Sequence, residues 1–486
     1  MDTPLIQNPT ARPPFHWPSL IQLILSLLAA LLLLGIVALY VIFGVMQLLN
    51  QTTNGVDPTQ YFMTAAGLTL ASALTLPSAW YAWKHLAYPT SVPSPRPERR
   101  GYGLILTVIV IILVSLALFL GNLVSQNSRI AWFLLPPLNL MATGLPVLWL
   151  VYIGKRGLSA GSPQRTWGIF ASGLVLGPAL ILALELAAII GVVFLAILWV
   201  AVNPSLANEL SSLASRLTNA APNQETILSI LTPYLVNPTT LFVAIAFIAV
   251  LVPLIEETFK PIGVWFLAGQ KLTPAEGFVS GLLCGAGFGL FENLGNTSAG
   301  GETWALLAAT RISTALLHCL TAGLVGWALA SAWSQRRYLR LGLTFAFAVL
   351  LHGLWNGMAV LSTAGSLDTI STASIPPLLQ QIGRLSSIGV VALGVFNFVL
   401  YLSFNAALRR SQRSISPLAA PLVPAGSVPT LEAEPLQTLP AETQEQPPVV
   451  STSPAEQIPP TPPTAEPSQA DSPAGENQPT STETTP

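Results

Sequence analysis

Charged residues are scarce in this sequence, in which Asp, Glu, Lys and Arg together make up 8% of 486 residues. An ordinary soluble domain carries about 25%. A soluble fold is therefore excluded, the more so because 52% of the chain is hydrophobic. Cysteine is also rare, and Cys284 and Cys319 lie within apolar runs, which predicts neither a disulfide nor a redox role. No basic segment interleaved with aromatic residues occurs, so nucleic acid is not expected as a partner and the lipid bilayer is.

Ten apolar runs are long enough to cross a bilayer, because a helix needs about 20 residues to span a hydrocarbon core of about 30 Å. The sequence therefore predicts an all-α fold, a polytopic membrane bundle of about ten transmembrane helices. The longest run, 167–203, is interpreted as one tilted helix. Two helices there would place the later arginines on the opposite side of the membrane from the other basic loops. The runs are 18–49, 61–83, 102–124, 130–153, 167–203, 239–269, 276–295, 303–333, 341–362 and 385–408.

Basic residues distinguish the two sides of the membrane, because cytoplasmic loops are enriched in Lys and Arg. With ten spans, fifteen of the twenty basic residues fall on the N-terminal side and three on the other side, while Lys260 and Arg311 fall within helices. We therefore expect a multi-pass cell-membrane protein with both termini in the cytoplasm.

The spans divide the chain into five segments. The last segment contains seventeen prolines, nine acidic residues and no basic residue, which predicts a disordered cytoplasmic tail. In the outer loop, residues 227–231 form a short amphipathic stretch expected on the membrane surface. The segments are a cytoplasmic N-terminus 1–17, five accessory helices with an outer loop 18–238, a core of helices six to nine 239–362, helix ten with its flanks 363–413, and the tail 414–486.

Ionisable residues inside the predicted helices are concentrated in helices six to nine. A charged side chain at the bilayer centre costs about 2.5–3.5 kcal/mol, so each one needs a reason. Helices one to four and helix ten contain no Asp, Glu, Lys or Arg, and helix five contains only Glu185. Counted from the cytoplasmic ends, four of the side chains reach depths of about 17 to 24 Å, which indicates one shared site. Those four are Glu256, Glu292, His318 and His352, and the same helices also hold Glu257, Lys260, Glu276 and Arg311.

Local spacing supports a shared site. Lys260 lies one helical turn after Glu256 and Glu257 and can neutralise either carboxylate. Pro253 frees a backbone carbonyl that protein or water must satisfy, so water near Glu256 is expected. The pair His352 and Asn356 shares one helix face, as does the pair Arg311 and His318. Glycines at every fourth position of helix seven, followed by Asn293, form a ridge that a neighbouring helix can approach closely: Gly277, Gly281, Gly285 and Gly289.

Four motifs in order resemble the PrsW family of intramembrane proteases, which is related to the CAAX prenyl protease and Abi superfamily. The resemblance covers about residues 245–360. The motifs are Glu256-Glu257-Thr258-Phe259-Lys260 for EExxK, Phe288-Gly289-Leu290-Phe291-Glu292-Asn293 for F-x-x-x-E-N, Arg311 with His318 on one helix, and His352-Gly353-Leu354-Trp355-Asn356 for H-x-x-W-N.

The resemblance implies hydrolysis of membrane-embedded protein substrates, such as anti-sigma factors, which would place the chain in a bacterial cytoplasmic membrane. It ties activity to Glu256, Glu257 and His352. We expect Glu256 to activate water and Glu257 to orient the water or the base. The histidines would act on the scissile carbonyl or the leaving amine, with Asn356 donating to the oxyanion. The predicted catalytic set is Glu256, Glu257, Lys260, Glu292, Asn293, His318, His352 and Asn356.

The mechanism has a metal alternative. Glu292, His318 and His352 form a His2Glu set of the kind that holds catalytic zinc. The paired glutamates and the lack of an H-E-x-x-H motif favour a metal-free glutamic mechanism, in which no cofactor is required.

Several of these residues also have a purely structural interpretation. Glu257 with Lys260 can be a buried ion pair, Arg311 can pair with Glu292 or reach the surface, and each histidine can be a packing residue. Glu185 suits a contact between helices, and Glu276 suits the N-terminal dipole of its helix. Two other functions are a catalytically silent scaffold and a proton-coupled transporter, although a transporter should show paired halves with charges in both.

Overall fold

The computed structural model describes residues 16–54, 57–88, 103–220, 224–367 and 375–415. These residues form helices and connecting loops, and no strand occurs among them, which confirms the predicted all-α fold. The predicted disordered tail at 414–486 lies almost entirely outside the described residues. The helices are α1 (Trp17–Asn54), α2 (Thr59–Ala87), α3 (Gly103–Ser125), α4 (Ser128–Gly154), α5 (Pro163–Ala171), η1 (Ser172–Leu176), α6 (Gly177–Ala201), α7 (Pro204–Ala220), α8 (Gln224–Leu235), α9 (Pro238–Ala246), η2 (Phe247–Leu251), α10 (Val252–Phe259), α11 (Ile262–Trp265), α12 (Pro274–Thr297), α13 (Trp304–Gln335), α14 (Tyr338–Gly365) and α15 (Pro377–Ile415).

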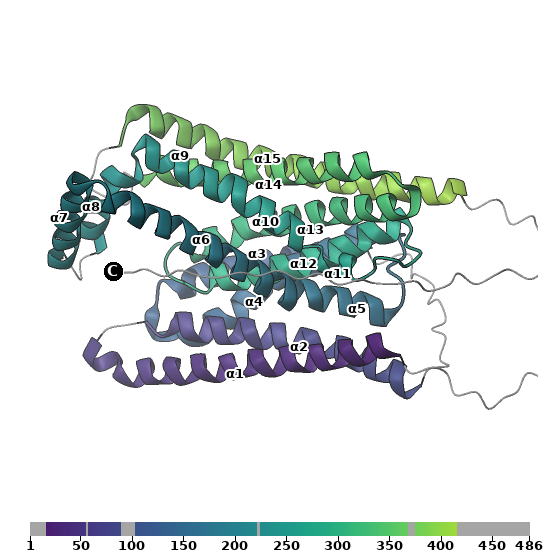
Figure 1. Cartoon of the computed structure of the whole chain (residues 1–486). Helices are drawn as coiled ribbons and strands as arrows, with labels where there is room; N and C mark the ends of the chain where they lie inside the picture. The colour runs from purple at the N-terminus through teal and green to yellow at the C-terminus, as the bar shows by residue number, and fades with distance from the viewer. Residues whose placement is uncertain (1–15, 55–56, 89–102, 221–223, 368–374, 416–486) are drawn as a thin grey trace, which may run out of the picture. The chain divides into compact units, whose positions relative to one another are not determined.

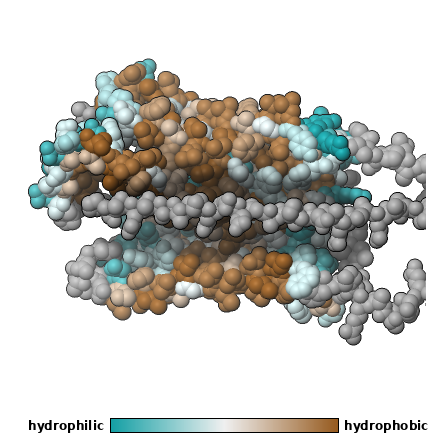
Figure 2. Space-filling view, viewed as in Figure 1, coloured by the Kyte–Doolittle hydropathy of each residue, from teal (hydrophilic) through white to brown (hydrophobic). Residues whose placement is uncertain are grey.

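Ten helical segments among the described residues are long and apolar enough to cross a membrane, as predicted. The predicted single helix at 167–203 is one span, Pro163–Ala201, made of α5, η1 and α6. Pro238–Trp265 is likewise one span, made of α9, η2, α10 and α11. Hydrophobic residues cover the middle of the molecule and hydrophilic residues gather at its two ends (Figure 2). The outer loop contains two short helices, α7 and α8, and α8 includes the predicted amphipathic stretch.

Helix α12 is the centre of the bundle. It lies between the α1–α2 pair and the α14–α15 pair in Figure 1, and most of its residues are buried. Its predicted glycine ridge packs against α13, because a side chain at Gly277, Gly281 or Gly285 would strike the α13 backbone. The fourth glycine, Gly289, faces the ring of His318. The ridge therefore brings two of the site-bearing helices into close contact.

The opposite side of α12 packs against η1. A Cβ atom at Gly287 would lie 2.6 Å from the backbone oxygen of Phe170, and one at Gly173 would strike the backbone of Cys284. Glu276 begins α12 in a capping box with Thr273 and also pairs with Arg165 of α5 at 3.3 Å. Glu276 therefore stabilises the helix N-terminus, as predicted, and is separate from the site.

Two π-helical turns interrupt the spans that flank α12. In each turn the last hydrogen bond runs from residue i to residue i−5, from Gly177 to Ser172 in η1 and from Val252 to Phe247 in η2. A proline, Pro178 or Pro253, follows each turn and donates no hydrogen bond. Such turns are frequent at functional sites, and the second one directly precedes α10, the helix that carries Glu256.

Candidate active site

The side chain of Lys260 lies at the centre of the site. It is fully buried, and its Nζ is 2.7 Å from Oε1 of Glu257 and 3.1 Å from Oε2 of Glu256. The same nitrogen lies 2.9 Å from Nδ1 of His318 and 4.9 Å from the centre of the Phe288 ring. Lys260 therefore neutralises both glutamates, as the spacing predicted, and it also links α10 to α13.

Glu257 is held by partners from three helices. Its Oε1 accepts hydrogen bonds from Lys260 at 2.7 Å and from Oγ1 of Thr321 at 3.1 Å, and it lies 2.8 Å from Nδ1 of His352. The residue is fully buried. With Oε1 saturated in this way, Glu257 orients the His352 ring and leaves that ring's Nε2 for other contacts. The sequence did not indicate Thr321, because a threonine in an apolar helix carries no charge that demands a partner.

Glu292 orients the second histidine. Its Oε2 lies 2.6 Å from Nε2 of His318, and its Oε1 pairs with Nη2 of Arg311 at 2.7 Å. Asn293 accepts a hydrogen bond from Nε of Arg311 at 2.9 Å and donates one to the Arg311 carbonyl at 3.0 Å. Arg311 is therefore paired with Glu292, one of the two contacts predicted for it. Asn293 acts through Arg311 and does not touch the two glutamates of α10.

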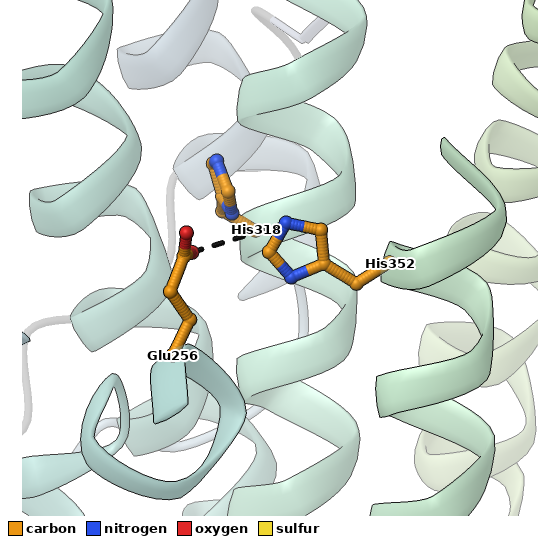
Figure 3. A group of neighbouring side chains, drawn as sticks. All are labelled: Glu256, His318 and His352. Carbon is orange, nitrogen blue, oxygen red and sulfur yellow. Dashed lines mark ion pairs between the residues drawn. The ribbon is translucent and has the colours of Figure 1, made fainter. Parts of the chain in front are cut away.

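Glu256 is the least constrained of the buried acidic groups. The residue is 7% exposed, and its Oε2 pairs with the Lys260 ammonium at 3.1 Å, a longer contact than the 2.7 Å that Lys260 makes to Glu257. Its carboxylate points at the rings of His318 and His352 (Figure 3), and Nε2 of His352 lies 3.9 Å from Oε2. Glu256 thus presents a buried oxygen to the space between two histidines, where it can accept a proton or bind a cation.

The structure groups Glu256, His318 and His352 as three donors whose ligand atoms all lie within 4.8 Å of one another. The sequence had suggested Glu292 as the carboxylate of such a set. Glu292 instead binds the far nitrogen of His318, as a carboxylate that orients a ligand histidine does. Glu257 holds His352 in the same way. The depths counted along the helices correctly indicated which helices meet. They did not indicate which carboxylate lies between the two histidine rings.

Asn356 has a different contact from the oxyanion role expected for it. Its Nδ2 donates to the carbonyl of Ile248 at 3.0 Å. In a π-helical turn such as η2, a carbonyl accepts a hydrogen bond from the N–H group five residues later. For Ile248 that residue is Pro253, which has no N–H group. Gly353 packs against the next carbonyl, that of Ala249. The Ile248 carbonyl is thus satisfied by a side chain of α14, which is the protein contact that the sequence allowed as one of two ways to satisfy a carbonyl freed by Pro253.

Replacing Asn356 with alanine is therefore expected to lower stability by about 1–3 kcal/mol, the cost of one polar group left unsatisfied away from water. Lipid offers no donor to the freed Ile248 carbonyl. The measurement is the Tm of the purified protein. Asn203→Ala is the matched control, because Asn203 makes the same type of bond to the Trp199 carbonyl at the exposed end of α6, where water can replace it. An Asn356→Ala variant as stable as the control would contradict this assignment.

Glu185 lies on α6, at the side of the site formed by α10 and α12. It is partly buried, and Glu256 and Glu292 are among the charged groups near it. The predicted role as a contact between helices is not supported by a hydrogen bond, since its buried Oε1 has no partner among the described residues.

Comparison with protein families gives a match over part of the chain. Residues 177–379 match the model of a family described as PrsW family intramembrane metalloprotease. The match begins at the first residue of α6, so it is wider than the resemblance seen in the motifs and includes the helix of Glu185. No curated protein and no solved structure matches the chain.

Proposed function

Through residues 177–379 this chain is a PrsW family intramembrane protease, and from that premise we propose that Glu256 is the residue that acts on the attacking water. The substrates of such an enzyme are membrane-embedded proteins, and the resemblance makes an anti-sigma factor of the bacterial cell membrane the first candidate. The observation that carries the proposal is the buried Oε2 of Glu256, which faces two histidines and whose one charged neighbour within 3.5 Å among the described residues is the Lys260 ammonium. The same match favours a protease over the scaffold and the transporter.

The neighbouring residues prepare Glu256 for this role. Lys260 supplies a counter-charge for the carboxylate pair in an apolar interior, where an unpaired charge would be costly. Glu257 and Thr321 fix the position of His352, and Glu292 fixes that of His318. Oε2 of Glu256 can then accept a proton from water, and Nε2 of His352 lies close enough to pass a proton toward the leaving amine. Every group is held before the substrate arrives, as electrostatic preorganisation requires.

The residues also fit a metal ion. Glu256, His318 and His352 would hold it, because they form a His2Glu set in which each histidine is oriented by a second carboxylate. When bound, zinc polarises a carbonyl and makes its water acidic. Lys260 contacts both Glu256 and Nδ1 of His318, so its ammonium competes with a cation for the same acceptors. The family description favours the metal-bound form over the metal-free mechanism that the paired glutamates suggested.

Purified protein tests both parts of the proposal. We expect stoichiometric zinc in the wild type and its loss in His318→Ala and His352→Ala, measured by elemental analysis. Cleavage is measured in liposomes with single-span reporters whose transmembrane segments carry a Gly-Pro or Asn-Gly helix break at different depths. Glu209→Gln, an exposed substitution on α7, is the matched control for both measurements. Full activity without metal would contradict the metal site, and no cleavage of any reporter would contradict the protease.

We also propose that both termini face the cytoplasm. The basic residues at the ends of α2, α4, α13 and α15 support this orientation, since the ten spans alternate in direction. A cysteine at Gln335, an exposed position at the end of α13, should then resist an impermeant thiol reagent in intact cells, whereas one at Ser211 of α7 should react. Cys284 and Cys319 are fully buried and give no background. Labelling at position 335 but not at 211 would reverse the orientation.

A further inference from the structure

Helix α6 carries one ionisable residue in an otherwise apolar sequence, and that residue is Glu185. The residues that follow it, 186–201, are almost all exposed. This part of α6 therefore makes few packing contacts that could offset the cost of placing a polar group in the membrane. A carboxyl group inside a membrane span is costly and calls for a functional explanation.

Glu185 faces the active site. Helix α6 packs against α10 and α12, the helices that carry Glu256 and Glu292. The ionisable groups near enough to act on its charge include Glu256, Glu292, Lys260 and His352, which are all residues of the site. None of these makes an ion pair or a hydrogen bond with it, and its Oε1 is buried without a partner within the described part of the chain. Glu185 is therefore an acceptor that the folded protein leaves unused.

The residues of the site differ in exposure, and the two that lie on the helices packed against α6 include the most exposed one. The side chain of Glu292 is 31% exposed and that of Glu256 is 9% exposed, whereas those of Glu257 and Lys260 are fully buried. A substrate that comes from the membrane reaches Glu292 and Glu256 before the deeper pair. Glu185, on α6, flanks this approach.

Hydrolysis inside a membrane creates a need for such an acceptor. A transmembrane substrate must unwind around its scissile bond, and each backbone N–H group released from its helix lacks a partner in lipid. A hydrogen bond to a carboxyl oxygen removes that penalty. We propose that Glu185 is a substrate-binding residue, whose free Oε1 accepts a hydrogen bond from a backbone N–H of the unwound segment beside the scissile bond. The inference rests on the proposed protease function.

Two substitutions separate this role from packing and from metal binding. Glu185→Leu removes the acceptor and suits an apolar helix, so it should fold, whereas Glu185→Gln keeps a carbonyl acceptor. Leu182→Ala is the control, because Leu182 lies on α6 and is 64% exposed. The probe is the single-span reporter that the wild type cleaves fastest.

We expect Glu185→Leu to raise KM about tenfold to a hundredfold, the value of one hydrogen bond to an ionisable group, with kcat nearly unchanged. Glu185→Gln should lose less than about threefold, as a weaker acceptor does. Zinc content and Tm should equal those of the Leu182→Ala control. Wild-type KM in Glu185→Leu, a loss confined to kcat, or a loss of zinc would overturn the inference while the wild type still cleaves the reporter. If the wild type cleaves no reporter, the proposed function fails first.

Discussion

The Glu256→Gln variant is expected to cleave the reporter about 10²–10⁴-fold more slowly than the wild type, the usual worth of a positioned proton acceptor. Glutamine has nearly the same shape but neither accepts the proton nor carries the charge. The substitution also removes one of the two acidic partners of Lys260, while Glu257 keeps its contact at 2.7 Å. The fold should therefore persist, and the loss should appear in kcat. The measurement is initial cleavage rate in liposomes at saturating reporter.

Zinc content in the same preparation separates the two ways in which Glu256 can act. If Glu256 is a metal donor, Glu256→Gln should also weaken zinc binding, because an amide is a poorer donor than a carboxylate. If zinc stays stoichiometric while activity is lost, the carboxylate acts on the water alone. Glu209→Gln should change neither quantity, since Glu209 is exposed on α7. Cleavage at the wild-type rate by Glu256→Gln would remove this residue from the mechanism.

The parts of the site that the sequence revealed are those that carry a large energetic cost. Glu256, Lys260 and His318 stand out in apolar helices because lipid makes each of them expensive, and the structure joins them. Thr321 did not stand out, although it holds Glu257, because a hydroxyl can satisfy itself on its own helix. Depth along the membrane was readable from the chain, whereas the rotation of each helix about its axis was not.

Asn356 shows the same limit in another form. Its spacing from His352 correctly placed both side chains on one face of α14. One helix face can still contact two different turns of the neighbouring helix, so the two side chains need not reach the same site. The contact with Ile248 arises from the π-helical turn η2, which has no clear signal in the sequence beyond Pro253. The number and order of the spans followed from the lengths of apolar runs.

Lys260→Met is expected to have the largest effect on stability. Its ammonium contacts Glu256, Glu257 and His318 and is fully buried, so its removal leaves two acidic groups without a counter-charge inside the membrane. Breaking a buried pair from one side costs about 3–5 kcal/mol. We expect lower membrane abundance and a clearly lower Tm in detergent, together with loss of cleavage. Methionine fills a similar volume, so the effect reports charge rather than a cavity.

The triple variant Lys260→Met, Glu256→Gln, Glu257→Gln is the test of this explanation. It removes all three charges while it keeps similar volumes, and replacing a whole buried ion cluster by neutral groups is often tolerated. The triple variant should therefore regain much of the Tm and abundance lost in Lys260→Met, yet stay inactive because Glu256 is gone. Stability in Lys260→Met equal to the wild type would show that the two glutamates do not need this counter-charge. A triple variant as unstable as the single one would assign the loss to packing around Phe288, whose ring lies against the Lys260 ammonium.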